Sequence, residues 1–276
     1  MNLTMSDGVV LNVETGGDPN DRLVVLLHGF PQSSRAWLRE LDRLVKEGFY
    51  VVAPDMRGYG KSEKPSAVSA YKSSRLALDI KEVIEGLGKK SALVVSHDWG
   101  AVVAWAVAAF HPEVVEKLII LNGPHPDRIK KLLKTDQDQR KRSWYIFFFQ
   151  LPMLPELFMR NEKTMPKVLR GATPNAFSEE DISYYRDAAR APGAARAMIN
   201  YYRASARYGL PRLPKVKAPT LVLWGEQDVA LSPKLLEHLD EHVDNLKIEM
   251  LPTASHWVIE DAPDEVHAAI RSFFAG

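Results

Sequence analysis

Ala92-Leu93-Val94-Val95-Ser96-His97-Asp98-Trp99-Gly100 is the segment that best indicates how this chain folds. An apolar run with β-branched members, typical of a buried strand, leads directly into the pattern small residue, any residue, nucleophile, any residue, small residue. We expect a tight turn from a parallel strand into a helix. Ser96 and Gly100 are small because a larger side chain there would collide with neighbouring backbone, and the turn holds Asp98 clear of the sheet.

The residue at the nucleophile position is an aspartate, where a serine would be expected. A carboxylate with an ordinary pKa of about 3.9 is already ionised at neutral pH and needs no base to activate it. Carboxylates are poor agents of acyl transfer, but they can displace a group at an alkyl carbon. Asp98 therefore predicts the opening of a strained ring or the expulsion of a halide rather than ester hydrolysis.

Length and composition set broad limits. The chain has 276 residues, a hydrophobic content of 46% and a formal net charge of +1. These values indicate one large α/β domain, or one domain with an insertion. The small net charge gives no strong field that would favour nucleic acid or an anionic membrane. The absence of cysteine excludes disulfides, thiol catalysis and cysteine-ligated metals.

The apolar segments of the chain are short. Residues 1–8 lack the apolar core of a signal peptide, and the longest apolar stretch, residues 101–110, is too short to span a bilayer. We therefore expect a soluble, cytoplasmic protein without a membrane partner. Its oligomeric state stays open, with a homodimer as one option.

Strand-like runs alternate with helical patterns along most of the chain. Continuous apolar runs predict buried parallel strands, and an edge strand precedes them. The predicted strands are 9–15, 23–27, 49–53, 93–96, 118–121, 220–224 and 247–250. Helical apolar spacing over 33–46, after a serine cap, and over 72–87 fills the intervals. This alternation predicts an α/β fold with a mostly parallel sheet that helices cover on both faces.

The alternation stops between Pro124 and Pro214. We predict a helical cap over 124–214, inserted between two parts of one core, residues 1–123 and 215–276. The cap should lie over the carboxyl ends of the strands, where open α/β sheets bind their ligands. It contains a dense aromatic block, residues 144–149, most of which we interpret as the core of a small helical subdomain.

The order of titratable residues along the chain predicts a catalytic triad. In folds with this elbow the acid and the histidine follow the nucleophile in that order. Asp228 follows the predicted strand 220–224, and His256 follows the last predicted strand. Other histidines fall in loops and caps or on helix faces that we expect to be exposed: His111, His125, His238, His242 and His267.

His28-Gly29-Phe30-Pro31 follows the second predicted strand and fits the loop of an oxyanion hole. Phe30 would supply one N–H group, and Trp99, the residue after the nucleophile, would supply the other. Gly29 lets the loop pass close to the nucleophile, and Pro31 fixes its direction. We interpret His28 as a residue that braces the loop.

With these residues in place the chain resembles the epoxide hydrolase branch of the α/β-hydrolase superfamily. The resemblance runs from about Leu11 to Phe273 and rests on the oxyanion loop and the elbow. It implies an eight-stranded, mostly parallel sheet with a helical cap, and the conversion of an epoxide to a vicinal diol. Asp98 would form an alkyl-enzyme ester, and His256 would activate the water that hydrolyses it. The implied partners are an apolar epoxide and water, with no cofactor, metal or nucleic acid.

The same family uses two cap tyrosines that hydrogen-bond to the epoxide oxygen. One lies in a segment similar to residues 143–150, which assigns the role to Tyr145, and the other in a segment similar to residues 200–203, which favours Tyr202 over Tyr201. A phenol is protonated at neutral pH, so it can donate to an alkoxide as it forms. The side chains that we expect to contact the substrate are Phe30, Pro31, Trp99, Phe149 and Trp257.

Two alternatives remain beside this reading of the sequence. Haloalkane dehalogenases share the aspartate and the tryptophan after it, but they usually place asparagine at the position of Phe30, and some place their acid at the position of Asn122. Fluoroacetate dehalogenases use arginines where this chain has Trp99 and Val102. A ligand-binding receptor on a hydrolase fold is the second alternative. Such proteins often lose a triad residue, whereas this chain keeps all three.

Overall fold

One eight-stranded sheet organises the molecule, which we describe from a computed structural model over residues 1–169 and 176–275. The strands are β1 (Asn2–Thr4), β2 (Val10–Gly16), β3 (Arg22–Leu27), β4 (Phe49–Pro54), β5 (Ala92–His97), β6 (Val115–Leu121), β7 (Thr220–Gly225) and β8 (Leu246–Leu251). They lie in the order β1-β2-β4-β3-β5-β6-β7-β8. The first two pairings are antiparallel, and every pairing from β4 to β8 is parallel.

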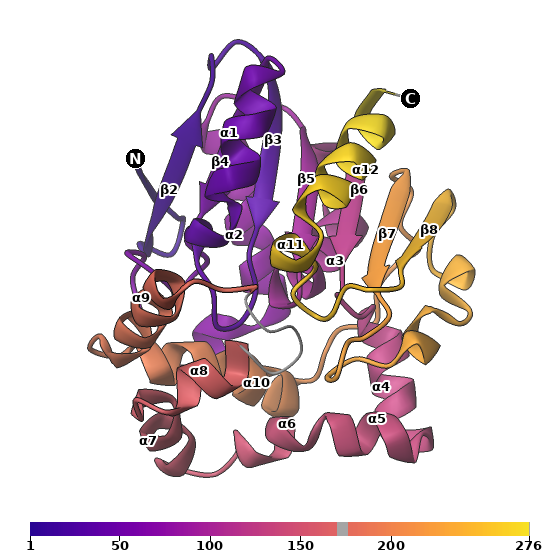
Figure 1. The fold of residues 1–276 in the computed structure, drawn as a ribbon. Coiled ribbons are helices and arrows are strands. Elements are labelled where there is room, and N and C mark those ends of the chain that lie inside the picture. The colour runs from indigo at the N-terminus through magenta and orange to yellow at the C-terminus, as the bar shows by residue number, and fades with distance from the viewer. Residues whose placement is uncertain (170–175, 276) are drawn as a thin grey trace.

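Helices cover both faces of this sheet (Figure 1). They are α1 (Leu38–Lys46), α2 (Ser73–Gly86), α3 (Trp99–Phe110), α11 (Val258–Asp261) and α12 (Pro263–Ala275), with short 3-10 helices η1 (Ser34–Trp37), η2 (Val68–Tyr71), η3 (Pro112–Val114), η4 (Pro233–Leu236) and η5 (Leu239–Glu241). Successive side chains of a strand point to opposite faces. Val24 and Leu26 of β3 accordingly pack with α1 and α12, whereas Val25 and Leu27 pack with α2 and α3.

A layer of helices, all of it inserted between β6 and β7, lies across one end of the sheet (Figure 1). These helices are α4 (Pro126–Thr135), α5 (Gln137–Arg142), α6 (Trp144–Phe148), α7 (Leu154–Arg160), α8 (Thr164–Leu169), α9 (Glu179–Arg190) and α10 (Ala194–Tyr208). The described part of residues 124–214 contains no strand. Residues 170–175 of the predicted cap are not among the residues that the structure describes. Among the described helices none has the length and apolar character needed to cross a bilayer.

The α/β fold class predicted from the sequence is confirmed, with differences at the edges. The strand β1 was not predicted, because three residues are too few to show an alternation of apolar and polar side chains. Its pairing with β2 is what defines it. The helix predicted over 33–46 consists of η1 followed by α1, and Ser33 caps the first of them by accepting from the Arg35 N–H. The strands β5, β6 and β8 each extend beyond their predicted bounds.

The aromatic block agrees in part with its interpretation as a subdomain core: Phe149 is buried and three more of its residues pack against the core, whereas two face solvent. Trp144 is 59% exposed and Phe147 56% exposed, and of the six residues only Phe149 is buried. The physical reason is that α6 is a single short helix at the outer edge of the inserted layer, so one face of it meets solvent (Figure 1). Residue type alone does not reveal this, because aromatic side chains usually bury their large apolar surface.

Candidate active site

Asp98 lies in the tight turn between β5 and α3, with φ 49° and ψ −116°. This backbone conformation is strained for a non-glycine residue and is held by tightly packed neighbours. A Cβ on Gly100 would lie 2.3 Å from the Leu27 carbonyl oxygen, and one on Gly29 would lie 2.5 Å from the Asp98 Cβ. Glycine at both positions therefore lets the oxyanion loop and the elbow approach each other.

The side chains of Asp98, Asp228 and His256 meet at the carboxyl ends of the strands. His256 Nδ1 lies 2.7 Å from an oxygen of Asp228, and His256 Nε2 lies 3.6 Å from an oxygen of Asp98. Asp228 follows β7 and His256 follows β8, so strand order alone brings the loops together. All three groups are largely shielded from solvent.

Four donors hold the Asp228 carboxylate. One oxygen accepts from the N–H groups of Ala230 and Leu231 at 2.7 and 2.8 Å, and the other accepts from the Asn122 amide at 2.8 Å and from His256. From the sequence, Asn122 is notable only as the position where some dehalogenases place their acid. In the structure Asn122, which follows β6, donates to Asp228, which follows the neighbouring strand β7, and so helps to position it. The sequence did not predict this contact.

The charge state of His256 depends on its two carboxylate neighbours. Burial by itself lowers the pKa of His256, but the charges and hydrogen bonds of Asp228 and Asp98 outweigh it and raise this pKa to about 10. Burial alone would raise the pKa of Asp98, yet His256 and the Phe30 N–H keep it below its usual value. The resting site therefore holds an imidazolium between two carboxylates.

The loop predicted to form the oxyanion hole reaches Asp98. The Phe30 N–H donates to an oxygen of Asp98 at 2.8 Å, and Trp99 begins α3 directly after the elbow. His28 Nε2 accepts from the Met56 N–H at 2.9 Å, and its Nδ1 contacts the Gly29 carbonyl oxygen at 3.0 Å. His28 is thus engaged on both ring nitrogens, as expected of a residue that braces this loop.

Of the two neighbouring tyrosines on α10, only Tyr202 lines the cavities that contain Asp98. Its ring packs edge-on against Trp99, with centroids 5.0 Å apart, and lies 5.8 Å from the ring of Tyr145. The Tyr201 hydroxyl points elsewhere and donates to the Arg57 carbonyl oxygen at 2.7 Å. Burial and then the charge of Asp98 raise the pKa of both Tyr145 and Tyr202, so both phenols stay protonated.

Two apolar cavities meet at the nucleophile, and Asp98, Tyr145 and Tyr202 line both. One has a volume of about 310 Å³ and runs along Trp99 toward α4; the other has about 190 Å³ and reaches His256. Of the side chains expected to contact substrate, Trp99 lines the larger, and the smaller is lined by Phe30, Phe149 and Trp257. Pro31, although described and buried, lines neither cavity.

Comparisons with known proteins show the family and the fold of this chain. The family model described as alpha/beta hydrolase fold matches residues 22–263. The AB hydrolase superfamily protein YfhM of Bacillus subtilis is 37% identical over 97% of this chain and 95% of its own length. Epoxide hydrolase 3 of Xenopus tropicalis is 34% identical over 96% of this chain and 75% of its own length. The chain belongs to the epoxide hydrolase family of α/β-hydrolases.

Solved structures of epoxide hydrolases share the whole architecture. A variant of the epoxide hydrolase from Bacillus megaterium superposes with a TM-score of 0.90 at 32% identity, and the match covers 100% of both chains. The family resemblance inferred from the elbow and the oxyanion loop is therefore confirmed, as is the α/β-hydrolase fold with its eight-stranded sheet.

Two histidines of this epoxide hydrolase family member, His242 and His267, differ from their sequence interpretation as residues on exposed helix faces, and the structure adds a contact for His97, to which the sequence assigned no role. His97, inside the elbow, is buried and contacts the His256 carbonyl oxygen at 2.8 Å, so it braces the loop of the triad histidine. His267 is not on an exposed face, because its ring nitrogens contact Glu40 and Glu47. His242 stacks on the ring of His125 at 4.3 Å. Long-range contacts of this kind leave no local signal in the sequence.

One group of the described residues could reach a metal ion, although the sequence suggested no ligand cluster. Ligand atoms of His125, Asp127 and His242 lie within 4.8 Å of one another. His125 Nδ1 accepts from the Asp127 N–H, and the Asp127 carboxylate pairs with Lys130 at 2.7 Å. None of the three lines the two cavities at Asp98, so we assign this group no part in the chemistry.

A buried carboxyl group joins the oxyanion loop to the loop of His256. One carboxylate oxygen of Glu260 accepts from the Gln32 side-chain amide nitrogen at 2.5 Å. The other carboxylate oxygen and the side-chain oxygen of Gln32, Oε1, have no hydrogen-bond partner among the described residues. Burial, with the charges of Asp261 and Asp181, raises the pKa of Glu260 to about 8. A proton on Glu260 would give it a donor, which an ionised carboxylate lacks.

We expect the free energy of unfolding to fall by a few kcal/mol between about pH 5 and pH 8, and Glu260→Gln to remove much of this fall. In that range folded Glu260 keeps a proton that the unfolded chain has released. Its contribution is therefore complete below the unfolded pKa and is lost as the pH rises through the folded value. Urea unfolding across this range measures the slope. Glu265→Gln, at an exposed position of α12, should keep the wild-type slope, and an unchanged slope in Glu260→Gln would show that Glu260 folds ionised.

Proposed function

We propose that this protein converts an epoxide to a vicinal diol in two steps through an ester on Asp98. The observation that carries this proposal is the arrangement of one carboxylate and two protonated phenols around a shared apolar space. A carboxylate can attack carbon, and the phenols can donate to the oxygen that leaves that carbon. A nucleophile and an acid on opposite sides of the substrate are what ring opening requires.

In the first step Asp98 attacks the less hindered ring carbon from behind. The carbon–oxygen bond on the far side breaks, and Tyr145 and Tyr202 donate hydrogen bonds to the departing oxygen. The product is an alkyl ester of Asp98 with a neighbouring alcohol. The proton that this alcohol needs is available in the site, because the resting His256 is an imidazolium.

In the second step His256 acts as the base that takes a proton from water. Ester formation removes the negative charge of Asp98, one of the two charges that hold the pKa of His256 high, so His256 releases its proton more easily at this stage. The water oxygen attacks the ester carbonyl carbon of Asp98, and the bond between that carbon and the alkyl oxygen then breaks. The new carboxyl group gives its proton to the departing oxygen, so the diol leaves and Asp98 is again a carboxylate. His256 regains from water the proton that it gave up in the first step.

The N–H groups of Phe30 and Trp99 are proposed to stabilise the oxyanion of this second step. The existing donation from Phe30 to an Asp98 oxygen supports the assignment, because that oxygen becomes the ester carbonyl oxygen. Each donor of an oxyanion hole typically lowers the activation barrier of such a reaction by about 3 kcal/mol.

The preferred substrates are proposed to carry apolar groups on both sides of the epoxide ring. This follows from the two cavities, which extend from Asp98 in different directions and have mainly apolar linings. The inserted residues 124–214 would act as the cap, since they supply Tyr145 from α6 and Tyr202 from α10. The partners in the reaction are then the epoxide and water alone.

A panel of apolar epoxides and haloalkanes of similar size tests this function. We expect diol from the epoxides and no halide release. Epoxides with apolar groups at both ring carbons should have a higher kcat/KM than those with one. Halide and alcohol from haloalkanes without any diol from epoxides would assign the protein to the dehalogenases. No turnover of either class would favour a ligand-binding role.

A further inference from the structure

Large apolar side chains gather on the outer surface of the inserted helices. They come from α6, α7 and the segment between them, and we call them the apolar patch: Trp144, Phe147, Leu151, Met153, Leu154 and Leu157. Their exposed fractions range from 44% for Leu151 to 72% for Met153. Figure 1 places α6 and α7 at the edge of the molecule farthest from the sheet. An exposed apolar surface of this kind usually marks a contact with another protein or a membrane.

Charge is distributed unevenly between the inserted helices and the rest of the chain. Residues 124–214 contain 17 Lys and Arg and nine Asp and Glu, a net charge of +8. The remaining residues contain 19 Lys and Arg and 26 Asp and Glu, a net charge of −7. The overall charge of +1 hides this asymmetry. The expectation that the protein has no membrane partner rested on that overall value and on the absence of a long apolar stretch.

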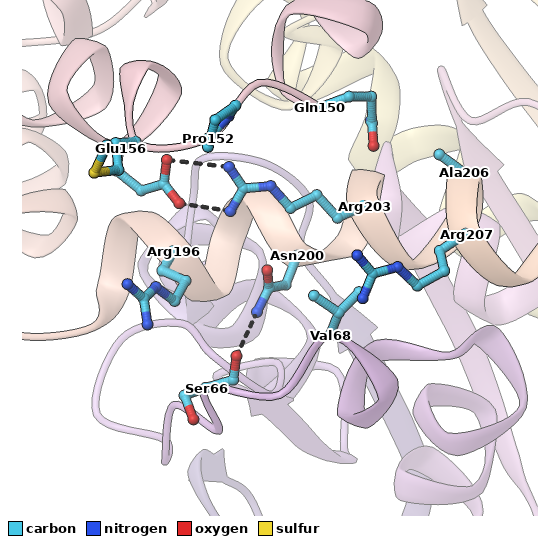
Figure 2. Close-up of a pocket in the computed structure, with 11 residues that line it drawn as sticks. Ser66, Val68, Gln150, Pro152, Glu156, Arg196, Asn200, Arg203, Ala206 and Arg207 are labelled. Carbon is cyan, nitrogen blue, oxygen red and sulfur yellow. Dashed lines mark hydrogen bonds and ion pairs between the residues drawn. The ribbon is translucent and has the colours of Figure 1, made fainter.

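A groove beside the apolar patch concentrates this positive charge. It has a volume of about 600 Å³, and Figure 2 shows Arg196, Arg203 and Arg207 of α10 along it, with Met153 of the patch among its lining residues. Glu156 pairs with Arg203 at 2.5 Å. Within the described residues neither Arg196 nor Arg207 has an ion-pair partner, and the groove therefore carries a net charge of +2 from these four groups.

A buried polar atom in the same groove lacks a partner. Asn200 is 1% exposed; its amide nitrogen donates to the Ser66 carbonyl oxygen at 3.3 Å, but its Oδ1 has no donor among the described residues. A ligand for this groove would thus combine negative charge for the arginines with a hydroxyl or ammonium donor for Asn200. The headgroup of an anionic phospholipid such as phosphatidylglycerol has both features.

We propose that the apolar patch and this arginine groove bind the surface of a bilayer that contains anionic phospholipid. The patch enters the boundary between headgroups and acyl chains, while Arg196 and Arg207 lie against lipid phosphates. The two contributions reinforce each other, because an apolar surface or a basic surface alone gives weak and reversible attachment. The negatively charged core then faces away from the membrane.

The charge distribution favours a bilayer over a second copy of the chain. A two-fold dimer through the apolar patch would place the same surface on both sides of the contact. The arginine groove of each copy would then lie close to the basic cap of the other, and like charges repel. An anionic bilayer presents the opposite charge over the whole cap surface.

Membrane attachment would place the catalytic cavities next to the lipid. Phe147 of the apolar patch lines the 310 Å³ cavity, and Trp144 lines the 190 Å³ cavity, both of which contain Asp98. An apolar epoxide dissolved in the bilayer could therefore reach the site without crossing water. This consequence rests on the proposed function, whereas the attachment itself does not.

Sedimentation with lipid vesicles tests the attachment directly. We expect the protein to sediment with vesicles of equal parts phosphatidylcholine and phosphatidylglycerol, and to remain mostly in solution with phosphatidylcholine alone. Rising sodium chloride should weaken the binding, because salt screens exposed charges. Since no catalytic turnover is measured, failure of the proposed function would not alter this result.

Two pairs of variants with matched controls separate the two contributions. Arg196→Gln with Arg207→Gln should weaken vesicle binding roughly tenfold or more. Lys46→Gln with Lys90→Gln removes the same charge from exposed positions on the core and should change it little. Met153→Ser with Leu157→Ser should also weaken binding roughly tenfold. The control for this pair is Ile248→Ser with Met250→Ser, at partly exposed positions of β8, which should change vesicle binding little. Thermal unfolding checks that each variant folds.

The proposal fails if the protein does not sediment with phosphatidylglycerol vesicles at low salt. It also fails if the control pairs lose as much binding as the cap pairs. A third contrary outcome is that the wild-type protein is a dimer in solution, does not bind vesicles, and becomes a monomer when Met153 and Leu157 are replaced. The apolar patch would then be an interface between two copies.

Discussion

Replacing both Tyr145 and Tyr202 by phenylalanine is expected to slow epoxide ring opening by roughly four orders of magnitude. A positioned general acid contributes about 10²-fold or more, and each variant removes one donor while keeping its ring. Each single variant should slow the reaction by roughly 10²-fold. Single-turnover kinetics with excess enzyme measures ring opening separately from ester hydrolysis.

Tyr201→Phe is the matched control for this pair. Tyr201 adjoins Tyr202 on α10 and is equally buried, but its hydroxyl donates to the Arg57 carbonyl oxygen rather than facing Asp98. We expect this variant to retain the wild-type rate of ring opening and to lose about 1 kcal/mol of stability with its hydrogen bond. If ring opening stays fast in the double variant, Tyr145 and Tyr202 are not the groups that stabilise the departing epoxide oxygen.

The residues that could be assigned from the sequence are those fixed by strand order. Asp98, Asp228 and His256 each follow a strand, and parallel strands end at the same edge of the sheet. Their proximity is therefore a consequence of topology, and the chain order of the three residues is enough to anticipate it. Gly29 and Gly100 follow from the same geometry, because the elbow leaves no space for a Cβ.

The choice between Tyr201 and Tyr202 required more than residue pattern. Adjacent residues on a helix point about 100° apart, so one faces the cavity and the other the core. Which is which depends on how α10 is rotated, and helix rotation is set by packing against η2 and the elbow. The family resemblance favoured Tyr202, and the structure supplies a physical reason: the Tyr201 hydroxyl donates to the Arg57 carbonyl oxygen, whereas Tyr202 lines both cavities at Asp98.

Contacts between distant segments could not be anticipated. Gln32 and Glu260 are 228 residues apart, and Asn122 and Asp228 are 106 apart, so neither pair leaves a local pattern. The expectation that Trp144 and Phe147 of α6 are buried was wrong for a related reason. The burial of a side chain depends on where its helix lies in the fold, and the composition of the helix does not reveal this. The charge asymmetry was present in the sequence, but it has meaning only once residues 124–214 are known to form one layer.

His256→Gln is expected to stop turnover and to trap the protein as an ester on Asp98. The attack by Asp98 should persist, because its carboxylate is ionised at neutral pH without help from a base, and water can give the new alkoxide the proton that His256 supplies in the wild-type protein. Hydrolysis of the ester should fail, because His256 is the only imidazole among the described residues that line the two cavities at Asp98. Intact-protein mass spectrometry measures the adduct, and peptide mapping locates it at Asp98.

The mass of the trapped adduct separates the two chemistries that an elbow aspartate can perform. Ring opening expels no leaving group, so an epoxide should add its full mass, whereas a haloalkane would add only its alkyl group and release halide. An adduct formed only with haloalkanes would move the protein to the dehalogenases. Rapid diol formation by His256→Gln without any adduct would mean that water attacks the epoxide directly, and Asp98 could not then be the nucleophile. Asp98→Asn provides the control, because an amide at this position should give neither adduct nor diol unless it is first hydrolysed back to the acid.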